Sequence, residues 1–272
     1  MRNEAEHQAD SEAVEPGARR SRDAEGINVL AVIHGTNARG GVFREVVEDA
    51  GHIYDEWSLA WGTPAPRPLD DYDAVIVFGG SMHADQDDHH PWLRDENDFI
   101  LGLLQRRVPL LGVCLGIQLI AKAAGEGVYR MQDGPEIGWV PVERSEGAAD
   151  DPVFGGLPER FDAFGWHYYT YDVPPAAEVL VTGPRCNQAY RLGDAAWGIQ
   201  FHAEVTLETV RSWLDDKDDF PLDHDRDVLW NETQERIGAW NDLGRGLCGA
   251  FLDVASARRA GETRGELTDV RA

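Results

Sequence analysis

The stretch Val108-Pro-Leu-Leu-Gly-Val-Cys-Leu-Gly-Ile-Gln118 decides how this 272-residue chain folds. It begins with an apolar run that suits a buried strand, and from Ile117 it continues as a plausible helix. Cys114 stands at the junction, between Gly112 and Gly116. A nucleophile on a sharp strand-to-helix turn needs small neighbours, because its backbone is strained and bulky residues would clash. The stretch therefore predicts a strand-to-helix unit of an α/β fold, with Cys114 as a candidate nucleophile at its turn.

A second stretch, Gly198-Ile-Gln-Phe-His-Ala-Glu204, reads as an apolar strand that ends in a histidine. In an extended chain, side chains two residues apart point to the same side, so Glu204 can orient the imidazole of His202. Taken alone, a cysteine after a strand is usually a small buried hydrophobe, and a His-x-Glu pair is usually surface chemistry. Both motifs, however, follow apolar strands, where open parallel sheets bind their ligands. Together they predict a catalytic triad of Cys114, His202 and Glu204.

The rest of the chain alternates between strand and helix patterns up to residue 125. Strands are expected at 27–33, 52–57, 73–78 and 108–113, and helices at 42–50, 91–107 and 117–124. This alternation predicts a parallel sheet with right-handed crossovers. Short strands are then expected at 138–143, 160–167, 178–181, 187–192 and 196–201, and helices at 206–214 and 228–259. The predicted fold is a single open, mostly parallel sheet flanked by helices, with extra short antiparallel strands.

The two ends of the chain differ in composition from the part between them. Residues 1–26 are acidic and polar without apolar periodicity, so we expect a disordered tail. Residues 27–259 are expected to form one domain, and residues 260–272 a flexible C-terminal tail. The first 26 residues have no apolar core of the kind that a signal peptide needs. No run approaches the roughly 18 apolar residues of a membrane span.

Composition limits the partners and the compartment. A net charge of −24 argues against binding nucleic acid, whose phosphates this surface would repel. Three cysteines, Cys114, Cys186 and Cys248, are too few and too scattered for a disulfide framework or a zinc site. We therefore expect a cytoplasmic protein without a metal, in which Cys114 stays reduced. His83, His89 and His90 lie among aspartates, a pattern that favours an exposed loop over a metal site.

These motifs together resemble the class I glutamine amidotransferases. The segments 112–118 and 201–205 resemble the triad motifs of that family, and residues 75–82 resemble its strand followed by a Gly-Gly oxyanion turn. Residues 166–174 and 187–191 resemble segments of the stand-alone, GMP-synthase-like branch. The similarity spans about residues 27–257. It implies a flavodoxin-like fold and hydrolysis of the glutamine side-chain amide through a thioester, with no cofactor.

The resemblance also suggests roles for residues around the triad. The backbone N–H groups of Gly80 and Leu115 are expected to form the oxyanion hole, with Gly79 as a further donor. Contacts with the substrate are expected from Gln118, which lies one helical turn beyond the nucleophile, and from Asn187. His167 either lines the pocket or is a packed core histidine.

Two departures from the family pattern leave alternatives open. Ala203 replaces the usual proline between histidine and glutamate, and Tyr169 stands where the branch often has an aspartate. The second departure keeps a hydrolase of γ-glutamyl peptides or conjugates open beside a glutaminase. A catalytically silent regulatory or binding module is the third alternative. We expect no synthetase domain with a phosphate-binding loop on this chain, and we expect ammonia to reach a separate synthetase subunit or to be released.

Overall fold

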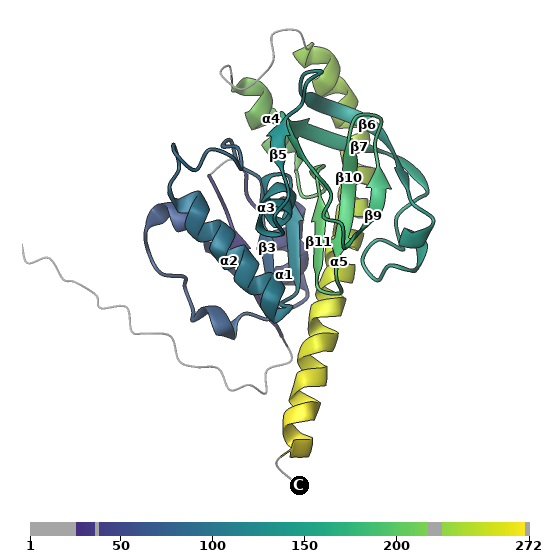
Figure 1. The fold of residues 1–272 in the computed structure, drawn as a ribbon. Helices are drawn as coiled ribbons and strands as arrows, with labels where there is room; N and C mark the ends of the chain where they lie inside the picture. Colours follow the sequence, from purple (N-terminus) through teal and green to yellow (C-terminus); the bar gives the residue numbers. More distant parts are fainter. Residues whose placement is uncertain (1–25, 36–37, 217–224, 270–272) are drawn as a thin grey trace, which may run out of the picture.

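The computed structural model of the chain describes residues 26–35, 38–216 and 225–269, and the side chains up to residue 261. Nearly all of the expected N-terminal tail therefore lies outside the described residues. The chain forms one open α/β sheet with helices on both faces (Figure 1). This architecture confirms the fold class that the sequence predicts.

The main sheet has nine strands within the described residues, in the order β2-β1-β3-β4-β11-β10-β9-β6-β7. They are β1 (Asn28–Val32), β2 (Ile53–Trp57), β3 (Ala74–Val77), β4 (Leu110–Val113), β6 (Glu136–Arg144), β7 (Arg160–His167), β9 (Ala177–Thr182), β10 (Asn187–Leu192) and β11 (Ala196–Ile199). The strands from β2 to β11 in this order are parallel, and the strands from β10 to β7 run antiparallel to their neighbours. A small second sheet pairs β5 (Val128–Arg130) with β8 (Tyr169–Tyr171).

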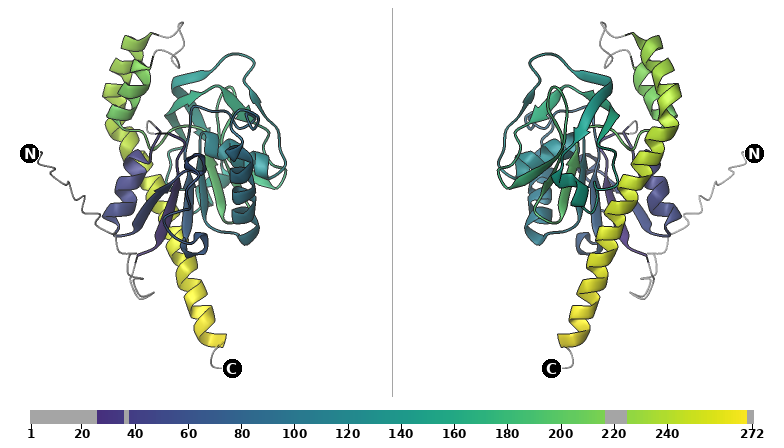
Figure 2. Two further views of the ribbon diagram at one scale, coloured as in Figure 1. Left: turned by 90° about the vertical axis from the view of Figure 1, so that its left-hand side faces the viewer. Right: turned by 90° about the vertical axis from the view of Figure 1, so that its right-hand side faces the viewer.

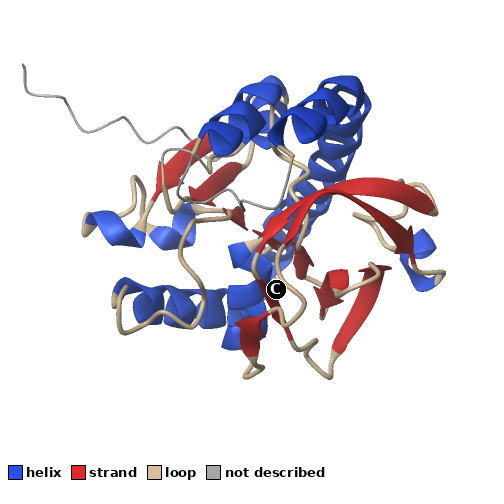
Figure 3. Cartoon of the chain, turned by 90° about the horizontal axis from the view of Figure 1, so that it is seen from above, coloured by secondary structure: helices blue, strands red, loops and turns tan. Residues whose placement is uncertain are grey.

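Helices cover the two faces of the sheet as separate layers (Figures 2 and 3). The helices are α1 (Gly41–Asp49), α2 (Trp92–Arg106), α3 (Leu115–Ala123), α4 (Leu207–Asp215) and α5 (Arg226–Asp269). Alternate residues of β1 are buried on opposite faces of the sheet, so each face needs its own layer of helices. Val29 and Ala31 pack in one core with α1, α4 and α5, while Leu30 and Val32 pack in the other with α2 and α3. A strand that is apolar at every position is thus buried on both faces, as in other parallel sheets.

Three local differences from the expected elements follow from the structure. α5 continues to Asp269, beyond the expected helix end at residue 259, whereas the division into a domain and two tails stays a prediction. The strand β11 ends at Ile199, so His202 and Glu204 lie in the bends that follow it. The strands β5 and β8 were not expected, because each has only three residues and the pairing forms across about forty residues of chain.

The pairing of β4 with β11 brings the two motifs together. Val113 lies opposite Ile199 in parallel register, so both chains leave the sheet at the same edge. The segment after β3 leaves at this edge too, since β3 pairs with the other side of β4. Three segments that are distant in sequence therefore meet beyond the carboxyl ends of adjacent parallel strands.

Candidate functional site

Cys114 lies on the sharp turn between β4 and α3. Its φ of 53° and ψ of −103° are strained for a residue with a side chain; Arg107 is the other non-glycine residue with positive φ in the described chain. The N–H of Cys114 donates to the carbonyl of Ile199 at 2.8 Å, which ties the turn to β11. The residue is 7% exposed. The strained turn thus holds the nearly buried thiol at the edge of the sheet.

The flanking glycines are required by close packing of the backbone. A Cβ on Gly112 would lie 2.6 Å from the carbonyl carbon of Gly116. A Cβ on Gly116 would lie 2.1 Å from the carbonyl oxygen of Val77 in β3. Because real Cβ atoms essentially never approach within 3.0 Å, neither position tolerates a larger residue without movement of the main chain. The glycines that the sequence stretch displays therefore set how closely α3 approaches the sheet.

His202 and Glu204 form a buried pair beside this turn. Nδ1 of His202 lies 2.7 Å from Oε1 of Glu204, and the two side chains are 4% and 3% exposed. The backbone of His202 is held on both sides: its N–H donates to the carbonyl of Phe164 at 2.8 Å, and its carbonyl accepts from Nε1 of Trp240 at 2.8 Å. The ring of Trp213 packs edge-on to the imidazole, with centroids 4.8 Å apart. These contacts leave the imidazole a single orientation.

The surroundings of His202 favour its charged form. Burial lowers the pKa of the imidazole, but the Glu204 carboxylate and the Cys114 sulfur outweigh burial and raise the pKa well above its ordinary value of 6.5. The thiol of Cys114 lies 3.9 Å from the carbonyl of Trp166, and the backbone of Gly79 passes close to both the thiol side chain and the imidazole. The arrangement can therefore hold a proton on His202 next to a sulfur nucleophile.

Gly79 and Gly80 follow β3 and reach the same place. A Cβ on Gly79 would lie 3.1 Å from Cε1 of His202 and 3.4 Å from Cβ of Cys114, so this backbone passes directly beside both side chains. Leu115, the first residue of α3, has its N–H at the start of that helix. The structure thus places Gly79 beside Cys114, with Gly80 next to it in the chain and Leu115 next to Cys114. The oxyanion role of the three N–H groups stays a prediction.

Gln118 is buried one turn into α3, and its amide is already engaged. Nε2 donates to the carbonyl of Tyr169 at 3.0 Å and to Oε1 of Gln200 at 3.1 Å. Both N–H groups of the amide are therefore used within the protein, and the carbonyl oxygen is the part left for another group. Gln200 lies in the motif that ends at Glu204, yet the sequence gives no sign of this contact.

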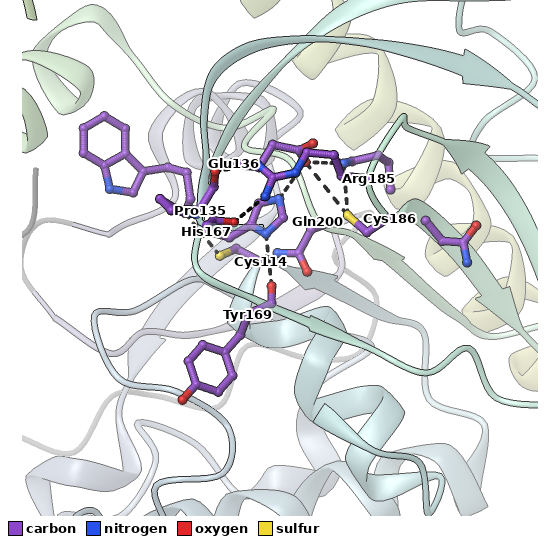
Figure 4. Close-up of polar contacts among 12 residues, drawn as sticks. Cys114, Pro135, Glu136, His167, Tyr169, Arg185, Cys186 and Gln200 are labelled. Carbon is purple, nitrogen blue, oxygen red and sulfur yellow. Dashed lines mark hydrogen bonds and ion pairs between the residues drawn. The ribbon is translucent and has the colours of Figure 1, made fainter. Parts of the chain in front are cut away.

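His167, at the end of β7, belongs to a buried polar cluster near Cys114 (Figure 4). Its Nδ1 lies 3.0 Å from the carbonyl of Tyr169, and its Nε2 lies 2.9 Å from Oε2 of Glu136. The same carboxylate oxygen accepts from Nε2 of Gln188 at 2.6 Å. Because both ring nitrogens of His167 are engaged, the structure favours the packed core histidine of the two alternatives.

The ligand atoms of Glu136, His167 and Cys186 lie within 4.8 Å of one another, a spacing that a metal ion would also fit. Burial raises the pKa of the Cys186 thiol to about 12, however, and the nearby Glu136 carboxylate adds to this rise. In the described structure, Oε2 of Glu136 lies within hydrogen-bond distance of Nε2 of His167 and accepts from Nε2 of Gln188. The cluster is thus explained by its hydrogen bonds.

Asn187 begins β10, the strand next to β11. Ala189 pairs with Ile199, so Asn187 lies at the sheet edge where β11 ends. Its carbonyl accepts a hydrogen bond from the hydroxyl of Tyr171 at 2.9 Å. The expected substrate contact by its side chain stays a prediction.

The comparisons with known proteins agree with this geometry. The family model "Glutamine amidotransferase class-I" matches residues 57–217. A glutamine amidotransferase-like protein of Salmonella typhimurium, YfeJ, is 28% identical over 193 residues, which cover 69% of this chain and 80% of that protein. Gamma-glutamyl peptidase 4 of Arabidopsis thaliana is 34% identical over 180 residues, which cover 64% of this chain and 70% of that protein. The crystal structure of a glutamine amidotransferase from Thermotoga maritima superimposes with a TM-score of 0.76 at 30% identity, covering 83% of this chain and 98% of that one.

This chain belongs to the class I glutamine amidotransferase family, because the matched residues include β4, the Cys114 turn, β11 and the His202 segment. The family resemblance suggested by the sequence is thereby confirmed. In the part of the chain that the structure describes, none of the helices is long and apolar enough to cross a membrane.

Proposed function

We propose that this protein hydrolyses the side-chain amide of glutamine, with Cys114 as nucleophile, His202 as acid and base, and Glu204 as the group that orients the histidine. The main support is a strained, buried cysteine beside the same Gly79 backbone as a histidine whose Nδ1 lies 2.7 Å from a carboxylate oxygen. This is the arrangement that nucleophilic catalysis by a thiol requires.

The reaction starts from a Cys114 thiolate beside a His202 imidazolium. The sulfur attacks the amide carbon, and the C–N bond breaks as His202 gives its proton to the departing nitrogen, which leaves as ammonia. The neutral imidazole then takes a proton from water, whose oxygen attacks the thioester. Glutamate leaves, and the thiolate and the imidazolium are restored. Glu204 accepts the Nδ1–H of His202 throughout and so stabilises the charge that His202 gains and loses.

The negative charge on the attacked oxygen needs donors that are already in place. In this proposal the N–H groups of Gly80 and Leu115 supply them, with Gly79 as a further donor. Removing one such donor typically lowers kcat by about 10² to 10³, so the positions of these peptide groups matter as much as the nucleophile. The close passage of Gly79 beside Cys114 supports this assignment.

The amino-acid end of the substrate is assigned to residues at the same sheet edge. The free carbonyl oxygen of Gln118 suits an ammonium group, and Asn187 offers an amide that can donate to a carboxylate. His167 acts indirectly, because its Nδ1 holds the Tyr169 carbonyl, which in turn receives the Gln118 amide.

The test is ammonia release by the purified chain and by three cysteine variants. We expect Cys114→Ala to abolish hydrolysis while the chain stays folded. Cys186→Ala and Cys248→Ala are matched controls and should keep most of the activity, since neither thiol contacts His202. Retained turnover in Cys114→Ala would exclude a covalent role for that residue.

A hydrolase of γ-glutamyl peptides or conjugates is the second candidate, favoured by the similarity to gamma-glutamyl peptidase 4. Both reactions bind the same glutamyl end, but the second needs room for a larger leaving amine. A comparison of kcat/KM for glutamine and for a γ-glutamyl dipeptide separates the two. A preference for the dipeptide by about tenfold or more would assign the second function. We favour glutamine because the Cys114 turn and residues 187–191 both resemble the amidotransferase branch.

The ammonia acceptor is proposed to be a separate synthetase subunit, with free release as the other outcome. Weak activity of the isolated chain on both substrates, restored by a co-purifying protein, would support the subunit. A silent regulatory or binding module is disfavoured by the complete set of three triad residues. Failure of the chain to hydrolyse either substrate, alone or with its partner, would revive that alternative.

A further inference from the structure

A third buried histidine–carboxylate pair, besides His202–Glu204 and His167–Glu136, lies beside the proposed oxyanion turn. His34 follows β1, and Glu96 lies in α2; their side chains are 1% and 0% exposed. Nε2 of His34 lies 2.9 Å and 3.1 Å from the two oxygens of Glu96, and its Nδ1 lies 3.1 Å from the carbonyl oxygen of Gly79. The pair therefore connects helix α2, through His34, to the Gly79 turn that passes Cys114.

The contacts of the ring define its protonation. Both nitrogens of His34 face acceptors, and a neutral imidazole has only one N–H, so only the imidazolium can donate to both partners. Burial lowers the pKa of His34, but the Glu96 carboxylate outweighs burial, and the net shift is upward from 6.5. The indole of Trp92 stacks on the ring with centroids 5.7 Å apart. Glu96 is the charged side chain that contacts His34 among the described residues.

The peptide unit between Gly79 and Gly80 transmits this contact to the site. In a planar trans peptide, the C=O and the following N–H point in opposite directions. The hydrogen bond that fixes the Gly79 carbonyl toward His34 therefore points the Gly80 N–H away from it. A donor with a full positive charge also polarises the peptide, which strengthens the N–H on the other side as a donor.

Packing adds to the constraint. A Cβ on Gly80 would lie 2.7 Å from Cβ of His34 and 2.6 Å from Sδ of Met82, so both side chains pack directly against this glycine. The turn is thus held by a charged hydrogen bond on its carbonyl and by contact with the His34 side chain.

We propose that His34, held by Glu96, is a positioning residue for catalysis: it fixes the Gly79–Gly80 peptide so that the Gly80 N–H is ready to bind the oxyanion. This inference rests on the proposed function, because it assigns a role within that reaction. His34 does not touch the substrate. Its effect on the reaction passes through the peptide, so its loss should lower kcat and leave KM nearly unchanged.

The experiment compares two reactions of Cys114 in the full-length chain. Amide hydrolysis forms an oxyanion, whereas alkylation of the thiolate by iodoacetamide does not. His34→Leu removes both hydrogen bonds of the ring. We expect kcat for glutamine or γ-glutamyl-p-nitroanilide to fall about tenfold to hundredfold, less than for loss of a donor outright, with the alkylation rate within about twofold of wild type.

Two further variants separate positioning from general stability. Glu96→Gln removes the charge but can still bond Nε2 through its amide N–H, which leaves an N–H on Nδ1 for Gly79. We expect kcat of this conservative variant to stay within about fivefold of wild type. His52→Leu is the matched control, because the half-buried ring of His52 accepts a hydrogen bond from the N–H of Ile27, before β1 and away from the Gly79 turn. Its kcat should be that of wild type.

The outcomes distinguish this inference from the function on which it rests. A wild-type chain that hydrolyses neither substrate, with or without a partner, would overturn the proposed function and the role of His34 with it. An active wild type with an equally active His34→Leu would overturn the role of His34 alone. A parallel fall in hydrolysis and alkylation would also overturn it, because the variant would then have disturbed the whole site.

Discussion

Substituting alanine for Gly116 should destabilise the protein, because the steric clash of the new Cβ outweighs the higher helix propensity of alanine. The new Cβ would lie 2.1 Å from the carbonyl oxygen of Val77 and 2.9 Å from its carbonyl carbon. Both atoms belong to a central strand of the sheet, which is paired on each side and cannot yield like a flexible side chain. The contact must be relieved by a shift of α3 away from β3 by about 1 Å or more.

The magnitude follows from two opposing terms. Overpacking of a dense core costs typically 1–3 kcal/mol, and a clash with main-chain atoms belongs at about the upper limit. Alanine gains about 1 kcal/mol over glycine in a helix. The net loss in the free energy of unfolding is therefore about 2 kcal/mol, which for a chain of this size lowers Tm by roughly 4–8 °C.

The control is the same substitution at Gly102 in α2, where a Cβ would meet nothing within 4 Å. Gly102→Ala should stabilise the protein by about 0.5–1 kcal/mol. Urea unfolding, with the midpoint and the slope fitted separately, measures both variants. Turnover adds a second readout, because a shift of α3 moves the Leu115 N–H, so kcat of Gly116→Ala should fall at least about tenfold. Equal stability of the two variants would refute the packing argument.

Two further predictions concern the buried carboxylates. Glu204→Gln should lower the pKa of His202, since the carboxylate that raises it is gone. Hydrolysis needs the imidazolium as an acid, so the alkaline limb of its kcat/KM profile should move to lower pH. An unmoved limb would argue against the pairing. The folded-state pKa of Glu136 is lowered from 4.5, because the His167 and Gln188 hydrogen bonds outweigh burial, which acts to raise it. Its stabilising contribution is thus present above pH 4.5 and lost as pH falls through the folded pKa. Unfolding measured across this range should show the stability difference between wild type and Glu136→Gln shrink with falling pH, and a constant difference would contradict the assignment.

Most of the fold could be predicted, because its determinants are local in sequence. Apolar runs bounded by turns give the central strands, and the glycines around Cys114 give the strand-to-helix turn. The triad is also visible, since His202 and Glu204 are two residues apart. The prediction that they lie on an extended strand is wrong in detail, as β11 ends before them, yet their side chains still meet at 2.7 Å.

The supporting contacts could not be predicted, because they join residues distant in sequence. His34 and Glu96 are 62 residues apart, and Gln118 and Gln200 are 82 apart. One signal was available: Glu96 falls in the apolar stripe of α2 with Leu93 and Ile100, and all three are buried. A carboxylate in such a stripe requires a cationic partner. Sequence alone does not say which residue supplies it.

The hydrogen bond from Trp240 to the carbonyl of His202 has a consequence for how the protein becomes active during synthesis. Trp240 lies 38 residues after the histidine, so at about 5–20 residues per second the ribosome needs roughly 2–8 s more to make it. Cys114 is made still earlier, before its neighbouring strand β11 exists. A nascent chain that ends between His202 and Trp240 therefore contains Cys114 and His202 but lacks the hydrogen bond that holds the His202 carbonyl. The helix that carries Trp240 is thus made last among the segments that hold the backbone of His202.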